Sequence, residues 1–377
     1  PYCPRCGTTL SDHELAQGYE TVVDPSVFVT CEVTDGDLAQ RFPGVALLVW
    51  TTTPWTLVSN TAVAVSAEAT YVVARKDGQT LVVAEDLLGA TLGEDAEILD
   101  RLPGADLQGM HYRPPFDLVD IPDAHFVIPG DFVTTSDGSG IVHLAPAFGA
   151  DDMAVCRAYD LPVVNPVTTD GHFGADVPLV GGKFFAHADE DLVADLDSRG
   201  LLFQRVPYEH AYPHCWRCHT PLIYYALPSW YIRTTAIKDQ LLAQNEATNW
   251  YPQTIQWGRY GDWLRNNIDW ALSRSRYWGT PLPIWRCDAD HLTAVGSRAE
   301  LSELAGSDVS VMDPHRPFVD DITIDCPTCG EVAHRVPEVI DCWYDSGAMP
   351  FAQFGYPQAN DEEFRQSYPA DFICEAI

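Results

Sequence analysis

A run of hydroxyl groups stands where an apolar segment ends. Residues 45–56 are VALLVWTTTPWT, so Thr51, Thr52 and Thr53 lie between two tryptophans, the second of which is Trp55. Apolar runs in soluble proteins usually end in turn residues such as glycine, asparagine or proline. Hydroxyl groups can position a water molecule or a sugar. The segment is therefore a candidate wall of a binding pocket, and an ordinary edge strand is the alternative.

A histidine and two aspartates follow in residues 138–152, GSGIVHLAPAFGADD. We expect His143 to end a strand and Asp151-Asp152 to open a helix, which would bring an imidazole and a carboxylate to one cleft. The carboxylate could hold an ammonium group, and the histidine could form a hydrogen bond or exclude a larger ligand. A helix N-cap and a buried core histidine are the alternatives, and spacing does not separate them. The motifs G-x-S-x-G and G-x-x-x-x-G-K-[ST] are absent, which leaves covalent acyl transfer and a P-loop without support.

Cysteines at metal-ligand spacing are the most specific signal in the chain. Three C-x-x-C pairs occur, at Cys3/Cys6, Cys215/Cys218 and Cys326/Cys329. Two such pairs supply the four corners of a tetrahedral zinc site. The first two pairs predict a complete site without an open position, and such a site is structural rather than catalytic. The third pair needs partners from upstream, where Cys287 and His291 are available and Asp290 is the poorer candidate.

Composition and charge place the chain among folded, reduced, multidomain proteins. It has 377 residues, 46% of them hydrophobic, and suits two or three domains. The C-x-x-C pattern in a large acidic chain favours a cytoplasmic, reducing environment. We expect the isolated cysteines among apolar neighbours to be core residues; they are Cys31, Cys156, Cys342 and Cys374. No run of about 18 apolar residues predicts a membrane span. The chain begins without methionine and has no leader, so we expect an internal piece of a longer protein.

An excess of acidic residues argues against nucleic-acid binding over the whole surface. The 22 basic and 54 acidic residues give a formal charge of −32. Affinity for phosphate depends on lysine and arginine, so nucleic acid would have to be held by local arginines or by other parts of the protein. Solubility is the simpler explanation of this acidity.

Short strands dominate the expected secondary structure from about residue 20 to 206. We expect a strand over residues 45–53, a hairpin over 70–85 with Asp77-Gly78 in its turn, and two strands within 125–146. Helices are expected over 85–92, 151–159 and 190–199, the last ending at Gly200, and over 230–244. This pattern predicts a β-barrel-like domain with helical decoration inside a larger α/β chain.

Several long motifs resemble the isoleucyl-tRNA synthetases, a family of class I aminoacyl-tRNA synthetases. The motifs are WTTTPWTLVSNTAVAV, GSGIVHLAPAFGADD, DWALSRSRYWGTPLPIW, VPEVIDCWYDSGAMPFAQ and ICEAI. They follow the order of that family and cover essentially the whole chain. Valyl and leucyl enzymes are similar too, but they typically carry Thr-Thr-Arg-Pro where this chain has Thr-Thr-Thr-Pro-Trp. CDADH stands where the family form with this insertion usually has C-x-x-C.

The resemblance implies a Rossmann catalytic core with an inserted editing domain on a zinc-bound neck. The implied parts are a neck in two halves (1–19 and 207–225), the editing domain (20–206), a return into the core (226–286), a smaller zinc-bearing insertion (287–336) and a truncated end of the core (337–377). The family's two ATP-handling signatures would lie outside this chain. It also implies ATP and Mg²⁺ as requirements of the full enzyme, tRNA(Ile), isoleucine and valine as partners, and a monomer.

Roles for individual residues follow from the same resemblance. In the family that the chain resembles, editing is needed because one methylene discriminates isoleucine from valine by only about 1–3 kcal/mol, a well-known example from that family. Asp152 is expected to bind the α-ammonium of valine misattached to tRNA(Ile), and His143 to exclude isoleucine. Thr51, Thr52 and Thr53 are expected to line the terminal adenosine and the attacking water, with Trp55 as a wall. Glu375, in ICEAI, matches an acidic residue of the amino-acid and adenylate pocket.

Three other interpretations remain open from the sequence. A valyl- or leucyl-tRNA synthetase would share the architecture. A zinc-containing RNA-binding module would share the knuckles but would not hydrolyse an ester. A free-standing deacylase would not need the tryptophan-rich motifs after residue 250.

Overall fold

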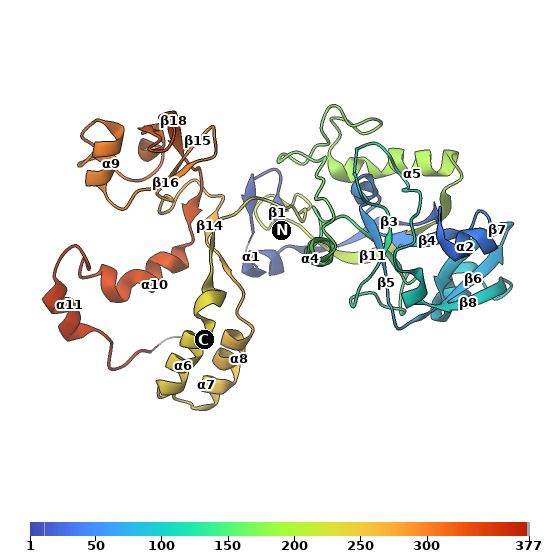
Figure 1. The fold of residues 1–377 in the computed structure, drawn as a ribbon, viewed down its shortest axis with the longest axis horizontal. Helices are drawn as coiled ribbons and strands as arrows, with labels where there is room; N and C mark the ends of the chain where they lie inside the picture. Colours follow the sequence, from blue (N-terminus) through green and yellow to red (C-terminus); the bar gives the residue numbers. More distant parts are fainter. Residues whose placement is uncertain (11, 375–377) are drawn as a thin grey trace. The chain divides into compact units, whose positions relative to one another are not determined.

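The computed structural model describes residues 1–10 and 12–374, without the side chains of Asp12 and His13. The chain divides into two compact units, Pro1–Ala226 and Leu227–Ile377, and each is described by itself (Figure 1). Within the described ranges, no helix is long and apolar enough to cross a membrane. The domain boundaries expected inside these units stay predictions.

Unit 1 is built on one mixed nine-stranded sheet plus a small hairpin near the N-terminus. Its strands are β1 (Tyr2–Cys3), β2 (Thr8–Thr9), β3 (Tyr19–Glu32), β4 (Ala46–Thr51), β5 (Ala62–Val65), β6 (Thr70–Lys76), β7 (Gln79–Ala84), β8 (Glu97–Pro103), β9 (Val127–Pro129), β10 (Ile141–Leu144) and β11 (Leu202–Pro213). The sheet order is β8-β6-β7-β4-β10-β5-β9, and β3 joins β4 to β11. The predicted β-rich domain is confirmed.

Short helices decorate this sheet, as the sequence predicted. They are α1 (Asp12–Ala16), α2 (Gly36–Arg41), α3 (Leu88–Leu92), α4 (Ala150–Ala158) and α5 (Asp189–Ser198), with 3₁₀ turns η1 (Pro54–Ser59), η2 (Glu85–Leu87), η3 (Gly104–Leu107) and η4 (Phe185–His187). Helix α5 packs against β3, β11 and η1 (Figure 1). Gly200 follows it with a left-handed φ of 68°, the conformation expected of a residue that ends a helix.

Apolar strand residues explain why the sheet is the core of unit 1. Strands β4, β5, β6 and β7 carry near-continuous runs of valine, leucine and alanine, and most of these side chains are fully buried. Such runs are typical of strands covered on both faces. The hairpin β6–β7 turns at Asp77-Gly78, where both residues have positive φ, as a two-residue turn requires.

A long antiparallel ribbon of β3 and β11 runs from the sheet toward the N-terminal hairpin. Its register is continuous from Gln204↔Phe28 to Pro213↔Tyr19 and places Pro207 opposite Pro25. Strand β4 pairs with β3 only as far as Val27↔Thr51. The sheet therefore loses β4 at the residue where the threonine run begins.

Unit 2 consists of small antiparallel pairs and helices. Its strands are β12 (Tyr231–Ile232), β13 (Trp270–Ala271), β14 (Ser273–Arg274), β15 (Ile284–Cys287), β16 (Leu292–Ala294), β17 (Ile324–Asp325), β18 (Val332–Arg335) and β19 (Val339–Ile340). Its helices are α6 (Lys238–Ala247), α7 (Thr254–Trp257), α8 (Arg259–Arg265), α9 (Arg298–Ala305), α10 (Cys342–Ala352) and α11 (Asp361–Ser367), with turns η5 (Thr234–Ile237) and η6 (Phe318–Asp321). The sheet β16-β15-β18-β17 packs its own apolar core around Trp285.

Two predictions about unit 2 are wrong. The helix expected from residue 230 starts later, because Tyr231–Ile232, an aromatic and a β-branched residue, pair with Trp270–Ala271 instead. Cys342 and Cys374 are exposed, whereas Cys31 and Cys156 are buried as predicted. Cys342 opens α10, a helix without any buried residue among those described.

Candidate functional site

The threonine run leaves the sheet and folds into a hydrogen-bonded turn. Thr51 is the last residue of β4, and η1 begins at Pro54. The hydroxyl of Thr53 lies 3.3 Å from that of Thr51 and 3.1 Å from that of Thr56, and the Thr53 N–H donates to Thr51 Oγ1 at 3.1 Å. Among the described residues, the partly exposed Thr52 has no side-chain hydrogen-bond partner. The turn therefore presents several hydroxyl groups close together.

The orientation of a buried asparagine fixes the protonation of His143. Asn60 Nδ2 donates to the carbonyl of Ala62 at 3.0 Å, and Asn60 Oδ1 accepts from the Tyr112 hydroxyl at 2.7 Å. The Ala62 carbonyl can only accept a hydrogen bond, so the Asn60 amide nitrogen, and not its oxygen, must face Ala62. The same nitrogen lies 3.3 Å from His143 Nδ1, which is thereby the acceptor. The proton of the neutral ring is therefore on Nε2.

From Nε2 the network continues to the threonine turn. His143 Nε2 lies 2.7 Å from Thr56 Oγ1, and this hydroxyl donates to the Thr53 carbonyl at 2.7 Å. Because the Thr56 proton is used there, Thr56 accepts from His143. Burial lowers the pKa of His143 from 6.5 to about 4. The ring is therefore neutral near pH 7, and both nitrogens are occupied, which does not suit a general base but suits a fixed wall of a pocket.

Asp152 lies in the first turn of α4 rather than at its N-cap, which is Gly149. Its carboxylate turns back so that Oδ2 accepts the Ala145 N–H at 2.8 Å, two residues after His143. Burial raises the pKa of Asp152, and the nearby Asp151 adds to this, while the Ala145 N–H opposes it. The half-buried carboxylate is thus held at the end of β10, where a cationic group would find an acceptor.

Close approach of the Asp152 carboxylate requires a glycine. A Cβ at Gly149 would lie 2.5 Å from Asp152 Oδ1 and 2.6 Å from its Cγ. The backbone at Gly149 is extended, so the restriction comes from space and not from φ. Gly149 is therefore the residue in the AFGAD segment that leaves space for the Asp152 carboxylate.

Trp55 is a packed core residue at the back of the threonine turn. Its ring lies 4.8 Å from the rings of both Phe148 and Phe185, between centroids, and is buried. Its backbone N–H donates to Asp189 Oδ1 at 2.7 Å. Thr51, Thr53 and His143 are thus joined through Thr56, and Asp152 is tied to the same strand end, whereas Glu375 lies outside the described residues. The network partners Thr56, Asn60 and Tyr112 were not predicted, although an asparagine within the apolar run LVSNTAVAV was a signal.

The first cysteine cluster has the geometry of a tetrahedral site. The sulfur atoms of Cys3 and Cys218 lie 3.6 Å apart, as do those of Cys6 and Cys218, and Cys6 and Cys215 are 4.0 Å apart. Zinc–sulfur bonds of about 2.3 Å place sulfurs about 3.8 Å apart in a tetrahedron. The separations are far too long for disulfides, which have S–S bonds of about 2 Å. This group could hold zinc.

The second cluster, Cys287, His291, Cys326 and Cys329, also fits an ion. Cys287 Sγ lies 3.7 Å from Cys329 Sγ and 3.5 Å from His291 Nδ1, close to the separations of about 3.8 and 3.5 Å expected for tetrahedral zinc. Asp290 takes the left-handed conformation of the turn, with φ 60°, and is outside this group. Of the two upstream candidates, His291 therefore lies within this group and Asp290 does not.

Each C-x-x-C pair folds in the same way. The residue after the second cysteine has positive φ, and its N–H donates to the carbonyl of the first cysteine; these residues are Gly7, His219 and Gly330. The segment after Cys287 differs, because the left-handed residue comes one position earlier, at Asp290, and the ligand follows it. With this shift, His291 of CDADH lies beside Cys287, Cys326 and Cys329.

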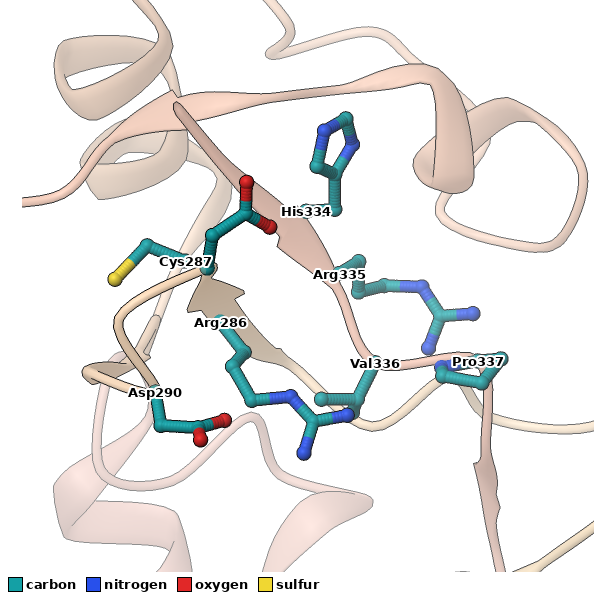
Figure 2. A pocket seen from close by; sticks show the side chains of 8 residues that line it. Arg286, Cys287, Asp290, His334, Arg335, Val336 and Pro337 are labelled. Atoms are coloured by element: carbon teal, nitrogen blue, oxygen red, sulfur yellow. The ribbon is translucent and has the colours of Figure 1, made fainter. Parts of the chain in front are cut away.

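A hollow of about 300 Å³ adjoins the second cluster and lies far in sequence from the threonine turn. The side chains around it come from the ends of β15 and β18 and the residues that follow them (Figure 2). The lining includes the guanidinium of Arg286 and the carboxylates of Asp288 and Asp290, so it has both signs of charge. Arg335 is already committed, because its guanidinium pairs with Asp320 and donates to the Glu338 carbonyl at 2.9 Å.

Comparison with known proteins identifies the family. The model of the tRNA synthetases class I (I, L, M and V) matches residues 1–377. The chain belongs to this family of class I tRNA synthetases. Similar relatives of this synthetase chain include isoleucine–tRNA ligases of Streptomyces coelicolor (65% identical), Thermobifida fusca (64%) and Thermus thermophilus (48%). Each alignment covers all of this chain but only 36% of the relative, so the chain spans about a third of the length of these curated relatives.

A solved structure is a more distant match to this synthetase. The crystal structure of GlLeuRS-CP1 is 15% identical, with a TM-score of 0.39, over 48% of this chain and 99% of that one. Such a remote likeness decides nothing about function. The family assignment depends on the match over the full chain.

Proposed function

We propose that this chain is part of an isoleucine–tRNA ligase and that its threonine site hydrolyses valyl-tRNA(Ile). The observation that carries the proposal is the network in which a neutral, fully engaged His143 meets the threonine turn while Asp152 is held at the same strand end. The names of the relatives support the choice of isoleucine and tRNA(Ile). Attachment of isoleucine with ATP and Mg²⁺ is an activity of the longer protein, to which Glu375 would contribute.

Each side chain has a part in the proposed hydrolysis. The carboxylate of Asp152 binds the α-ammonium group of the misattached valine, and the immobile ring of His143 leaves no room for the extra methylene of isoleucine. Thr51, Thr52 and Thr53 orient the terminal ribose and one water molecule. The water oxygen bonds to the ester carbonyl carbon, the bond from that carbon to the ribose oxygen breaks, and the ribose oxygen takes the proton that the water gives up.

The proposal needs no general base among these residues, because an aminoacyl ester is already activated and positioning can supply about 7–11 kcal/mol of the barrier. The two cysteine clusters would hold structural zinc without taking part in the reaction. The domain arrangement proposed is the one implied by the resemblance, with the editing domain over residues 20–206 and the neck at the first cluster.

The test is hydrolysis of valyl-tRNA(Ile) and isoleucyl-tRNA(Ile) by the purified chain, with zinc quantified in the same sample. The parent should hydrolyse the valyl ester and spare the isoleucyl ester. Asp152→Ala should abolish valyl-tRNA hydrolysis, while the exposed neighbour Asp151→Ala serves as the matched control. His143→Ala should allow isoleucyl-tRNA to be cut. A parent that hydrolyses neither ester, or variants that all act like the parent, would reject the assignment.

A further inference from the structure

The helical turn that carries the threonines is capped from an unexpected place. The first N–H groups of a helix lack internal partners, and a threonine at the N-cap usually accepts one of them with its side chain. Thr53 is the N-cap of η1, but its hydroxyl makes no capping bond. Pro54 has no N–H, and the next donor, Trp55 N–H, binds Asp189 Oδ1 at 2.7 Å, from a residue 134 positions later in the chain.

The consequence for Thr53 is that its hydroxyl is available elsewhere. It points to the hydroxyls of Thr51 and Thr56, at 3.3 and 3.1 Å. To cap η1, the Thr53 oxygen would have to accept the Trp55 N–H, which it does not do in its present rotamer. A rotation that brought it there would take it away from the hydroxyls of Thr51 and Thr56. The cap supplied by Asp189 and the hydroxyl network of the turn are therefore linked.

Asp189 is held in place by packing. It is the first residue of α5, and the ring of Phe185, in the preceding turn, packs on Trp55. Burial raises the pKa of Asp189 to about 7; the carboxylate of Asp24 on β3 adds to this, while the Trp55 N–H and Arg205 on β11 oppose it. Burial also raises the pKa of Tyr212 on β11, and the negative charges of Asp24 and Asp189 raise it further.

A half-buried acid of this kind destabilises the fold when it is ionised. No ion pair of Asp189 occurs among the described residues, and its Oδ1 accepts the Trp55 N–H. Groups that reduce stability are expected at positions with a functional purpose. Among the described residues, the hydrogen bond to the Trp55 amide joins the Asp189 side chain to the threonine turn.

We propose that Asp189 is a positioning residue of the threonine site: by binding the Trp55 amide, it keeps the Thr53 hydroxyl from capping η1 and holds it in the network with Thr51 and Thr56. This proposal builds on the proposed hydrolysis of valyl-tRNA. In the proposed hydrolysis, Asp189 contacts neither the substrate nor the attacking water, and it acts only through the threonine turn.

A double-mutant cycle with Thr53 tests this coupling. Asp189→Ala should lower kcat/KM for valyl-tRNA(Ile) hydrolysis about tenfold, since small misplacements of catalytic groups have effects of this size. In a Thr53→Ala background the same change should have less than about a twofold effect, because the two act as one unit. Asp189→Asn keeps an acceptor oxygen and should restore most of the activity. Glu190→Ala, at the exposed next residue, is the matched control.

A structural readout decides the proposal even if activity is absent. Crystal structures of the parent and Asp189→Ala should show the Thr53 hydroxyl moving from Thr56 to the Trp55 amide. An unchanged Thr53 hydroxyl, or effects of Asp189→Ala and Thr53→Ala that multiply independently, would overturn the role of Asp189. A parent without hydrolysis would instead overturn the proposed function, and the two structures would still test the cap.

Discussion

His143 makes the stability of unit 1 depend on pH in a calculable way. Its pKa is about 4 in the folded protein, against 6.5 for a free imidazole, because the ring is buried. Between these values the unfolded chain binds a proton that the folded chain does not. The neutral ring's contribution to stability is therefore fully present above pH 6.5 and is lost as the pH falls toward 4. At pH 4.5 the loss amounts to roughly 2.5 kcal/mol.

A comparison of the parent with His143→Gln isolates this contribution from the many carboxylates. The cost of the substitution in free energy of unfolding, measured by hydrogen exchange of amides in β4 and β10, should shrink by roughly 2.5 kcal/mol from pH 7.5 to 4.5. His187→Gln, which removes an exposed imidazole, is the control. Should the glutamine variant not fold, an NMR titration of His143 in the parent gives the same information. A cost that does not change with pH, or a ring that titrates near 6.5, would refute the buried, neutral histidine.

Three further substitutions test other parts of the structure. Gly149→Ala should displace the Asp152 carboxylate and lower valyl-tRNA hydrolysis about tenfold with little change in Tm, since its Cβ would lie 2.5 Å from Oδ1; unchanged kinetics would contradict this reasoning. Asp320→Ala should destabilise unit 2 by about 3 kcal/mol in urea unfolding, because it leaves the buried Arg335 guanidinium without its carboxylate. Asp189→Asn should raise Tm at pH 8 but not at pH 4, because the folded pKa of about 7 lies above that of an unfolded aspartate and the ionised form alone is unfavourable; a gain at both pH values would point to another cause.

Features encoded by neighbouring residues were predictable from the sequence. The hairpin turn at Asp77-Gly78 and the three cysteine knuckles follow from short patterns whose backbone requirements are local. The strand before the threonines was predicted too, but its predicted end lies two residues beyond the observed end at Thr51. Its end depends on the neighbouring strand, which the local pattern does not contain.

Contacts between distant segments were beyond prediction from one sequence. The Asp189–Trp55 bond joins residues that only the packing of α5 on η1 brings together. The choice of His291 over Asp290 depended on which of them takes the left-handed position of a turn. The hydrogen-bond pairing of Asn60 with His143 likewise needed the register of β5 and β10, in which Val63 faces His143.

The opposed prolines of the long ribbon explain where the threonine turn begins. Pairing of β3 with β11 continues on both sides of Pro25 and Pro207, so their nitrogens face away from each other, toward the outer edges. If the pairing of β3 with β4 continued two residues past Val27↔Thr51, Pro25 would lie opposite Thr53. Proline has no backbone N–H, so it could not donate a hydrogen bond to Thr53. The threonine turn therefore begins where the adjacent strand β3 lacks a backbone N–H, at Pro25. If the threonine motif were transplanted into another sheet, its residues would not form the same turn unless the neighbouring strand also had a proline at the matching position.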